Sequence, residues 1–475
     1  MVNISKGGGY SRRQVLARGS AAAGTAVVGS FLAACGGNDS KSTASGAKKA
    51  AGPAKVNLNK TVDITLWTWA WPAPDAGAKT FVAAFEKAEP MVKLKVKQYP
   101  YPDYVTALRT GIPNGTAGEV LHLETGSMLR QYAKFLSPIE ERVKADWGAS
   151  WESEFADGSV TEIRQSTQDG KTLYALPQQA SVGGFVWYNK KLFEKAGVEV
   201  PKSYEDLKTI SAALRGKGTI PMAWGAKDQW PNTDWLIAFA SQYKPGVVDA
   251  AERGKTKFTD EAIVNALKFM KQSLSDGIWN KAPFATTAFP EAYGTFTGGK
   301  SAMTSNGTWG LNLFKPKDLK NFGVFLFPQI TGVPDSGKLG SAKTGAPVDS
   351  GPGGALPWKT DNLTVGVRSG LSKDKAEAAY RFARYWCGEE GQKVGAQTFT
   401  PVRKDVANPL VTPEFQEQYD FMNSLAGVAE PRQFQFTETR TALQDAIANV
   451  CVKGADAQSE LAKVDTAVQR ARRRA

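Results

Sequence analysis

The chain has 475 residues, of which 42% are apolar, so it can bury a large core and is longer than one core usually supports. Its formal net charge of +13 is concentrated at the ends, because residues 1–60 carry nine Lys and Arg against one acidic residue and residues 470–475 carry four Arg. The intervening residues 61–469 are nearly neutral, with 46 basic and 45 acidic side chains. We therefore expect two lobes and no nucleic-acid-binding surface.

The first 34 residues have the features of an export signal. Residues 11–16 form a twin-arginine pattern, and an Ala/Gly/Val run at 19–34 is too short to span a bilayer. The run ends in Leu-Ala-Ala-Cys35, which resembles the lipobox of bacterial lipoproteins, whose cysteine receives a diacylglyceryl group. We expect a mature protein that begins at Cys35, lipid-anchored to the outer face of the cytoplasmic membrane, with residues 35–60 as a flexible linker. An Ala-rich tail with an incidental cysteine is the alternative, and it leaves the order of these elements unexplained.

The first elements of the body form a βαβ unit. Residues 62–68 have the pattern of a strand, residues 76–89 that of a helix that stops at Pro90, and residues 92–98 that of a second strand. The indoles of Trp69 and Trp71 follow the first strand, because Pro72 cannot donate to a sheet ladder.

Strands and helices continue to alternate along the chain. Ser203 and Asp206 form a capping pair before a helix that ends near Gly216. Other expected elements are a helix at 103–110, a strand at 119–123 and helices at 127–135, 372–388 and around 461–468. This order predicts an α/β fold of open sheets with helices on both faces, in which ligands bind beyond the carboxyl ends of strands.

The few cysteines and the single histidine limit the chemistry. Cys387 and Cys451 leave open a disulfide or two buried thiols. His122, in a strand-like segment, is expected to be a satisfied core residue, and no Cys or His cluster has zinc spacing. We therefore predict no metal site and no cofactor.

Four segments carry a family resemblance. They are GGKSAMTSNGTWG at 298–310, the long segment 169–207 with Tyr188-Asn189-Lys190, the helical segment 376–392, and TPVRKDV at 400–406. Together they resemble the bacterial extracellular solute-binding proteins of carbohydrate ABC importers, similar to the maltodextrin-type binding proteins. In that family a tryptophan in the position of Trp309 forms a wall of the sugar site.

The resemblance implies a two-lobed fold of the type II periplasmic-binding-protein kind, with the ligand in the cleft. Lobe one would comprise 61–179 plus 328–395, and lobe two 180–327 plus 396–475. Residues 332–358, rich in Gly, Pro and Ser, form a connection longer than usual for the family. The ligand-binding residues that the resemblance implies are Trp69, Trp71, Glu124, Thr125, Gln178, Gln179, Ser181, Gln229, Trp230 and Trp309.

These residue types suit a sugar. Indoles offer flat apolar platforms for the C–H face of a pyranose, whereas Glu, Gln, Thr and Ser offer hydrogen bonds to its hydroxyls. The alternative for each indole is a place in the core, which we expect for Trp67 inside the first strand. The implied function is to capture a sugar, most readily an oligosaccharide, and to deliver it to a membrane permease. The resemblance further implies a monomer without enzymatic activity. A binder of a polyamine or other polar solute and a glycoside-active enzyme remain as alternatives.

Overall fold

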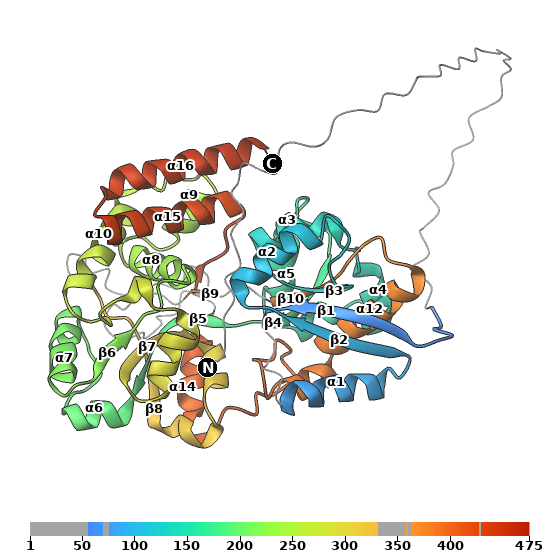
Figure 1. Ribbon diagram of the computed structural model, residues 1–475, viewed down its shortest axis with the longest axis horizontal. Helices are drawn as coiled ribbons and strands as arrows, with labels where there is room; N and C mark the ends of the chain where they lie inside the picture. Colours follow the sequence, from blue (N-terminus) through green and yellow to red (C-terminus); the bar gives the residue numbers. More distant parts are fainter. Residues whose placement is uncertain (1–55, 70–75, 331–357, 360–362, 427–428, 475) are drawn as a thin grey trace, which may run out of the picture. The chain divides into compact units, whose positions relative to one another are not determined.

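The structure, a computed structural model, describes residues 56–69, 76–330, 358–359, 363–426 and 429–474. The predicted export signal, Cys35, Trp71 and most of the connection at 332–358 therefore lie outside the described residues. Two mixed sheets, each surrounded by helices, make up the described part of the chain (Figure 1).

The first sheet has five strands in the order β2-β1-β3-β10-β4. The first three strands are parallel, and β10 is antiparallel to both of its neighbours. The strands are β1 (Val62–Thr68), β2 (Val92–Gln98), β3 (Val120–Glu124), β4 (Ala175–Gln179) and β10 (Leu363–Val367). The helices α1 (Ala76–Ala88), α2 (Tyr101–Gly111), α3 (Ser127–Tyr132), α4 (Glu140–Trp147), α5 (Ser159–Gln165), α12 (Lys373–Cys387) and α13 (Glu389–Gly395) accompany it. Among them, α12 packs on β1, β4 and β10.

The second sheet is built around β5, which pairs antiparallel with β7, β8 and β9. Its strands are β5 (Val182–Asn189), β6 (Ile220–Ala223), β7 (Ser301–Gly307), β8 (Phe322–Leu326), β9 (Trp358–Lys359) and β11 (Glu430–Pro431). The helices are α6 (Lys190–Ala196), α7 (Tyr204–Gly216), α8 (Trp230–Tyr243), α9 (Val247–Glu252), α10 (Glu261–Ser275), α11 (Tyr293–Thr297), α14 (Gln416–Ser424), α15 (Thr437–Lys453) and α16 (Ala457–Arg474).

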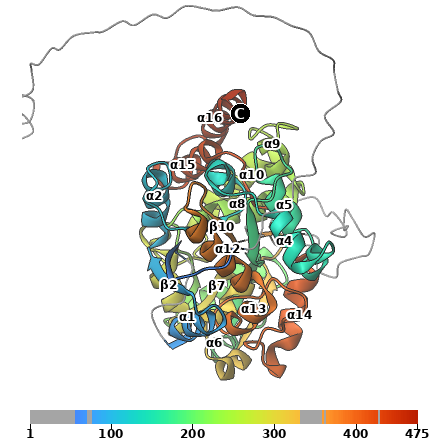
Figure 2. The same ribbon diagram turned by 90° about the vertical axis from the view of Figure 1, so that its right-hand side faces the viewer.

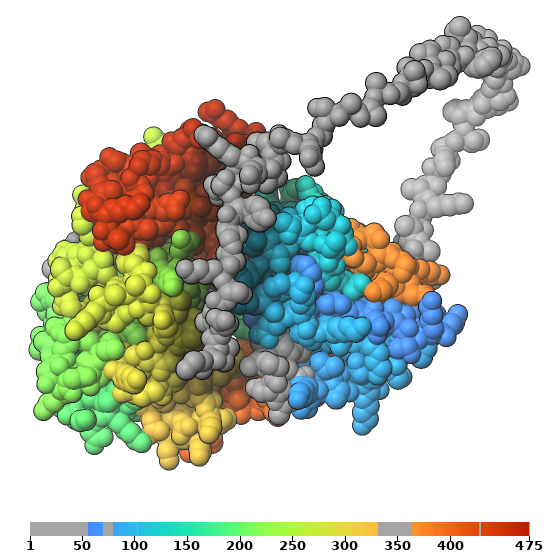
Figure 3. Space-filling view, in the orientation of Figure 1, coloured from blue at the N-terminus to red at the C-terminus, as the bar shows by residue number. Residues whose placement is uncertain are grey.

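The C-terminal helices complete the second group. Both ribbon views show α15 and α16 side by side (Figures 1 and 2), and α15 also packs on α8 and α10. On the face drawn in Figure 3 the two helices form one continuous patch, coloured red. Among the described residues, no helix combines the length and apolar character needed to cross a membrane.

Local sequence signals explain several boundaries. In β1 the apolar side chains alternate into the core at its start, and Trp67 is buried as expected, with the glycines at 111 and 118 packed against its ring. The capping pair of Ser203 and Asp206 is present at the start of α7, where each side chain accepts a hydrogen bond from the other's backbone N–H. Both predictions are confirmed.

The first sheet packs into one hydrophobic cluster and the second into two, since Val186 of β5 belongs to the larger cluster, here called the second core, whereas Phe185 and Trp187 belong to a smaller one. Cys387 is buried in the core of the first sheet, and Cys451 packs against the second core, so both cysteines in the described part of the chain are free thiols. Ile330 contacts the second core and β9 pairs in the second sheet, although the expected ranges would place both with lobe one. Conversely, Phe399 and Val402 contact the first core. The chain therefore crosses between the cores later than the resemblance implied.

Candidate functional site

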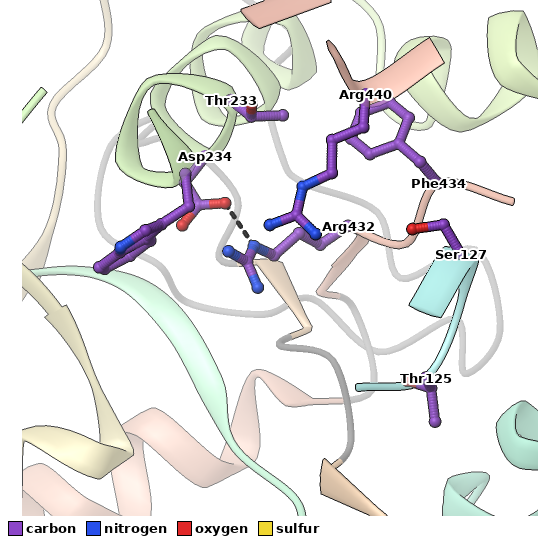
Figure 4. A pocket seen from close by; sticks show the side chains of 8 residues that line it. Thr125, Ser127, Thr233, Asp234, Arg432, Phe434 and Arg440 are labelled. Carbon is purple, nitrogen blue, oxygen red and sulfur yellow. Dashed lines mark hydrogen bonds and ion pairs between the residues drawn. The ribbon is translucent and has the colours of Figure 1, made fainter. Parts of the chain in front are cut away.

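A pocket of about 290 Å³, here called pocket A, lies where residues from both sheets meet. The carboxyl end of β3 contributes Thr125, and the start of α3 contributes Ser127. The other lining residues come from the elements around the second sheet: Trp230, Thr233, Asp234, Arg432, Phe434 and Arg440. Figure 4 shows the side chains of Asp234, Arg432 and Arg440 directed toward one another, so pocket A is strongly polar with aromatic walls.

A second space of about 310 Å³, here called pocket B, adjoins pocket A, because Trp230 and Asp234 line both. Its walls carry three further aromatic side chains, those of Trp224, Tyr293 and Trp309. The remaining lining residues are Ala223, Gly225, Pro231, Ala288, Ala292, Thr304 and Ser305. The indole of Trp309 lies so close over Gly307 that a side chain there would collide with the ring.

The N-terminal end of α8 presents the shared residues. Gln229, exposed, caps the helix with a left-handed φ of 65°, and Pro231 occupies the first turn, where its missing N–H costs nothing. Trp230 and Asp234 are four residues apart and therefore share one face of the helix. The guanidinium of Arg432 lies 5.8 Å from the centre of the Trp230 ring.

An ion pair is buried at the junction of the pockets. The Nε of Arg432 donates to Oδ1 of Asp234, whose side chain is about 2% exposed. Burial raises the pKa of Asp234, and the charges of Arg432 and, further away, Arg440 oppose this. The pair thus fixes the orientation of both side chains in the pocket wall.

The segment from Arg432 to Arg440 also contacts the first sheet's loop after β3. Arg440 Nη1 lies 3.3 Å from Oε2 of Glu124, which accepts a 2.8 Å hydrogen bond from the Tyr101 hydroxyl. Gln433 Nε2 donates to Oγ1 of Thr125 and, at 3.2 Å, to Glu162. These contacts border pocket A and join the two groups of elements.

The structure brings together three of the predicted site residues in the pockets. Thr125, Trp230 and Trp309 line the pockets. Glu124 does not line either pocket, but its carboxylate accepts a hydrogen bond from Arg440, which lines pocket A. Gln179 and Ser181 hydrogen-bond each other at 3.0 Å, where the chain passes from β4 to β5. They are not among the residues that line either pocket, nor is Gln229.

Two of the predicted residues, Trp69 and Gln178, contact His122 in an aromatic cluster and do not line the pockets. Trp69 stacks on His122 with ring centres 4.9 Å apart and also contacts Tyr101 and Tyr104. Gln178 is buried, and its Oε1 lies 3.1 Å from Nε2 of His122, while Thr68 bonds the other ring nitrogen. Burial lowers the pKa of His122 to about 3, so the ring is neutral and satisfied, as the sequence predicted.

Sequence reasoning missed most of the polar lining. Asp234, Arg432, Phe434 and Arg440 line pocket A but were not among the predicted site residues. The alternation of polar and aromatic side chains at 432–436 (RQFQF) is the one local signal that could have pointed to them. Their places depend on contacts with residues far away in the chain.

Comparison with known proteins identifies the family. A sequence profile described as bacterial extracellular solute-binding protein matches residues 80–423, well over half of the chain. An uncharacterized ABC transporter extracellular-binding protein of Pyrococcus horikoshii is 23% identical over 58% of this chain and 62% of its own length. The multiple sugar-binding protein of Streptococcus mutans is 24% identical over 54% of this chain and 59% of its own length. The chain thus spans about three fifths of the length of these curated relatives.

Solved structures show the same fold. A chitin oligosaccharide binding protein superimposes with a TM-score of 0.70 at 21% identity, covering 86% of this chain and 99% of that one. The predicted fold class, an α/β fold of the two-lobed periplasmic-binding-protein kind, is therefore confirmed.

Proposed function

Because the chain belongs to the bacterial extracellular solute-binding protein family, we propose that it is the solute-capturing component of an ABC importer and that its ligand is a sugar of oligosaccharide size. One observation carries the proposal: the adjoining pockets A and B combine five aromatic side chains with a row of polar side chains. The names of the multiple sugar-binding protein and the chitin oligosaccharide binding protein agree with it.

The chemistry of the lining suits a pyranose. Trp230 and Trp309 provide flat apolar surfaces for the C–H faces of sugar rings, and Tyr293 adds a third aromatic wall. Thr125, Ser127 and Thr233 provide hydroxyls that both donate and accept, as the rim of a sugar requires. The two pockets adjoin at Trp230 and Asp234, so a ligand that occupies both has at least two rings.

The cellular setting follows from the N-terminal sequence. We propose export by the twin-arginine route, lipid attachment at Cys35, a flexible linker to residue 60, and a monomeric protein that passes its ligand to the permease. Two lobes, with ranges close to those expected from the resemblance, would close around the ligand by rotation about the crossings between the two cores.

The two alternatives have less support. A polyamine site needs several convergent acids, whereas the two carboxylates near pocket A, those of Asp234 and Glu124, are each bound to an arginine. A glycosidase needs two carboxyl groups facing each other across the scissile bond, and Glu124 is already engaged by Tyr101 and Arg440. We therefore propose a binding protein rather than an enzyme.

The test is a thermal-shift screen followed by calorimetric titration. The panel contains malto-, xylo-, galacto- and chito-oligosaccharides of two to four rings, together with spermidine, and a chromogenic-glycoside assay runs in parallel. We expect at least one sugar to raise the melting temperature and bind with one-to-one stoichiometry, and no release of chromophore. Binding of spermidine alone, or turnover of a glycoside, would replace the proposal with the corresponding alternative.

A further inference from the structure

Asp234 occupies a special position, because its carboxylate lines both pockets. Its Oδ1 is taken by Arg432, but its Oδ2 is buried without a hydrogen-bond partner among the described residues. A buried carboxylate oxygen that accepts no hydrogen bond is costly and is rare in folded proteins. The unused oxygen therefore indicates a partner that the protein itself does not provide.

Two neighbouring side chains share this property. The Thr233 hydroxyl, which lines pocket A, and the Trp224 indole N–H, which belongs to a residue lining pocket B, are both buried without a partner among the described residues. Thr233 is adjacent to Asp234 in α8, and Trp224 lines pocket B together with Asp234, so a hydroxyl and an N–H donor belong to the same lining as the carboxylate. A ligand that satisfies all three must carry several groups able to donate and accept, which is a property of hydroxyl-rich molecules.

The charges around Asp234 restrict the ligand further. Two guanidinium groups, those of Arg432 and Arg440, are matched by two carboxylates, those of Asp234 and Glu124. A ligand carboxylate would have to compete with these carboxylates for the arginines, and a ligand ammonium at Asp234 would lie close to two positive charges. A hydroxyl donating to Oδ2 meets neither conflict.

Building on the proposed sugar-binding function, we infer that Asp234 is a specificity-determining residue that accepts a ligand hydroxyl through Oδ2 at the junction of pockets A and B, and that the site selects uncharged sugars over acidic or amino sugars. Arg432 acts as a positioning residue, because its bond to Oδ1 turns Oδ2 toward the ligand. The same carboxylate lies in both pockets, so a ligand of two rings bridges them at this point.

The experiment compares affinities by calorimetric titration on the purified mature protein. The ligand pairs differ in charge and in one substituent: N-acetylchito-oligosaccharides against their deacetylated forms, which lose the acetyl group, and α-1,4-linked galacto-oligosaccharides against oligogalacturonates, which carry a carboxylate in place of the hydroxymethyl group. The variant Asp234→Asn keeps the shape and an acceptor for Arg432 but places an N–H₂ at the position of Oδ2. Asp260→Asn is the control, because Asp260 caps α10 away from both pockets and asparagine caps helices equally well.

We expect a neutral sugar to bind at least 10-fold more tightly than its charged counterpart, Asp234→Asn to weaken that sugar roughly 10- to 100-fold, and Asp260→Asn to bind as the wild type does. If Asp234→Asn fails to fold, the affinities of the wild-type protein for the neutral and the charged sugar of each pair still test the inference. Equal or tighter binding of the charged sugars, or unchanged affinity in a folded Asp234→Asn, overturns the inference while leaving sugar binding intact. If no sugar binds at all, the proposed function fails and this inference falls with it.

Discussion

Replacing one indole in the pocket and one in the core separates ligand binding from stability. Trp309 lines pocket B and is only partly buried, whereas Trp67 is 8% exposed within β1 and packs in the first core. We expect Trp309→Ala to weaken sugar binding more than Trp67→Ala does, and Trp67→Ala to cost more free energy of unfolding. The two variants serve as controls for each other.

The magnitude at Trp309 follows from the area that a sugar ring covers. One face of an indole against a pyranose removes on the order of 100 Å² of apolar surface from water, worth ~2 to 3 kcal/mol, which is about thirty- to a hundred-and-fifty-fold in affinity. The fold should tolerate the change because the residue lies in a short 3₁₀ segment at the edge of β7.

The magnitude at Trp67 follows from its packing. A tryptophan buries about 150 to 250 Å², and truncation of a core indole costs ~3 to 5 kcal/mol. Relaxation cannot fill the space easily, since the ring rests against backbone at residues 111 and 118. Urea melts measure the stability and calorimetric titration the affinity. If Trp309→Ala binds as the wild type does but melts far earlier, the indole is a core residue and our placement of the site is wrong.

Three further predictions concern the anchor, the motion and the pH response. Cys35→Ser should release the mature protein into the medium, and equal membrane retention of both forms after a high-salt wash would contradict lipid attachment. A saturating sugar should reduce the radius of gyration in small-angle scattering, whereas an unchanged profile at saturation would exclude closure. Burial raises the pKa of Glu252 and Glu430 from 4.5 to about 7, so their stabilising contribution, complete below the unfolded-state pKa, is lost as the pH rises through 7. The free energy of unfolding from urea melts should therefore fall by up to ~2.5 kcal/mol per group between about pH 5 and about pH 8, and Glu252→Gln should flatten that slope.

The fold was predictable where local signals decide the structure. The strand at 62–68 and the strand at 92–98 have the predicted bounds, and α1 differs from its prediction by one residue, because alternation, helical spacing and Pro90 act within a few residues of each element. The ranges of the two lobes were less accurate. A crossing between cores is set by tertiary packing, so nothing local distinguished Ile330 or Phe399 from their neighbours.

The site was predictable only where a motif marked it. Trp309 lies in the segment 298–310 that carries the family resemblance, the resemblance also implied Trp230, and both line the pockets. Gln178 shows the limit of such reasoning, because one residue along a strand decides which face a side chain occupies: its amide points to His122 in the core, whereas Gln179 bonds Ser181. The roles of the two arginines could not be predicted from local sequence, because Arg432 is 198 residues from its partner Asp234 and Arg440 is 316 residues from its partner Glu124.

The segment that carries these arginines links ligand contact to closure. Its base is fixed to the second group of elements, since Glu430 accepts hydrogen bonds from the backbone N–H of Gly246 and Glu252 accepts from those of Gln435 and Phe436. Its far side touches the first sheet's loop through Gln433 and Arg440. Under the proposed lobe closure, these contacts would form only when the two groups of elements approach each other, and the same segment would then complete pocket A. The binding free energy of a ligand in pocket A would in that case be coupled to the free energy of closing.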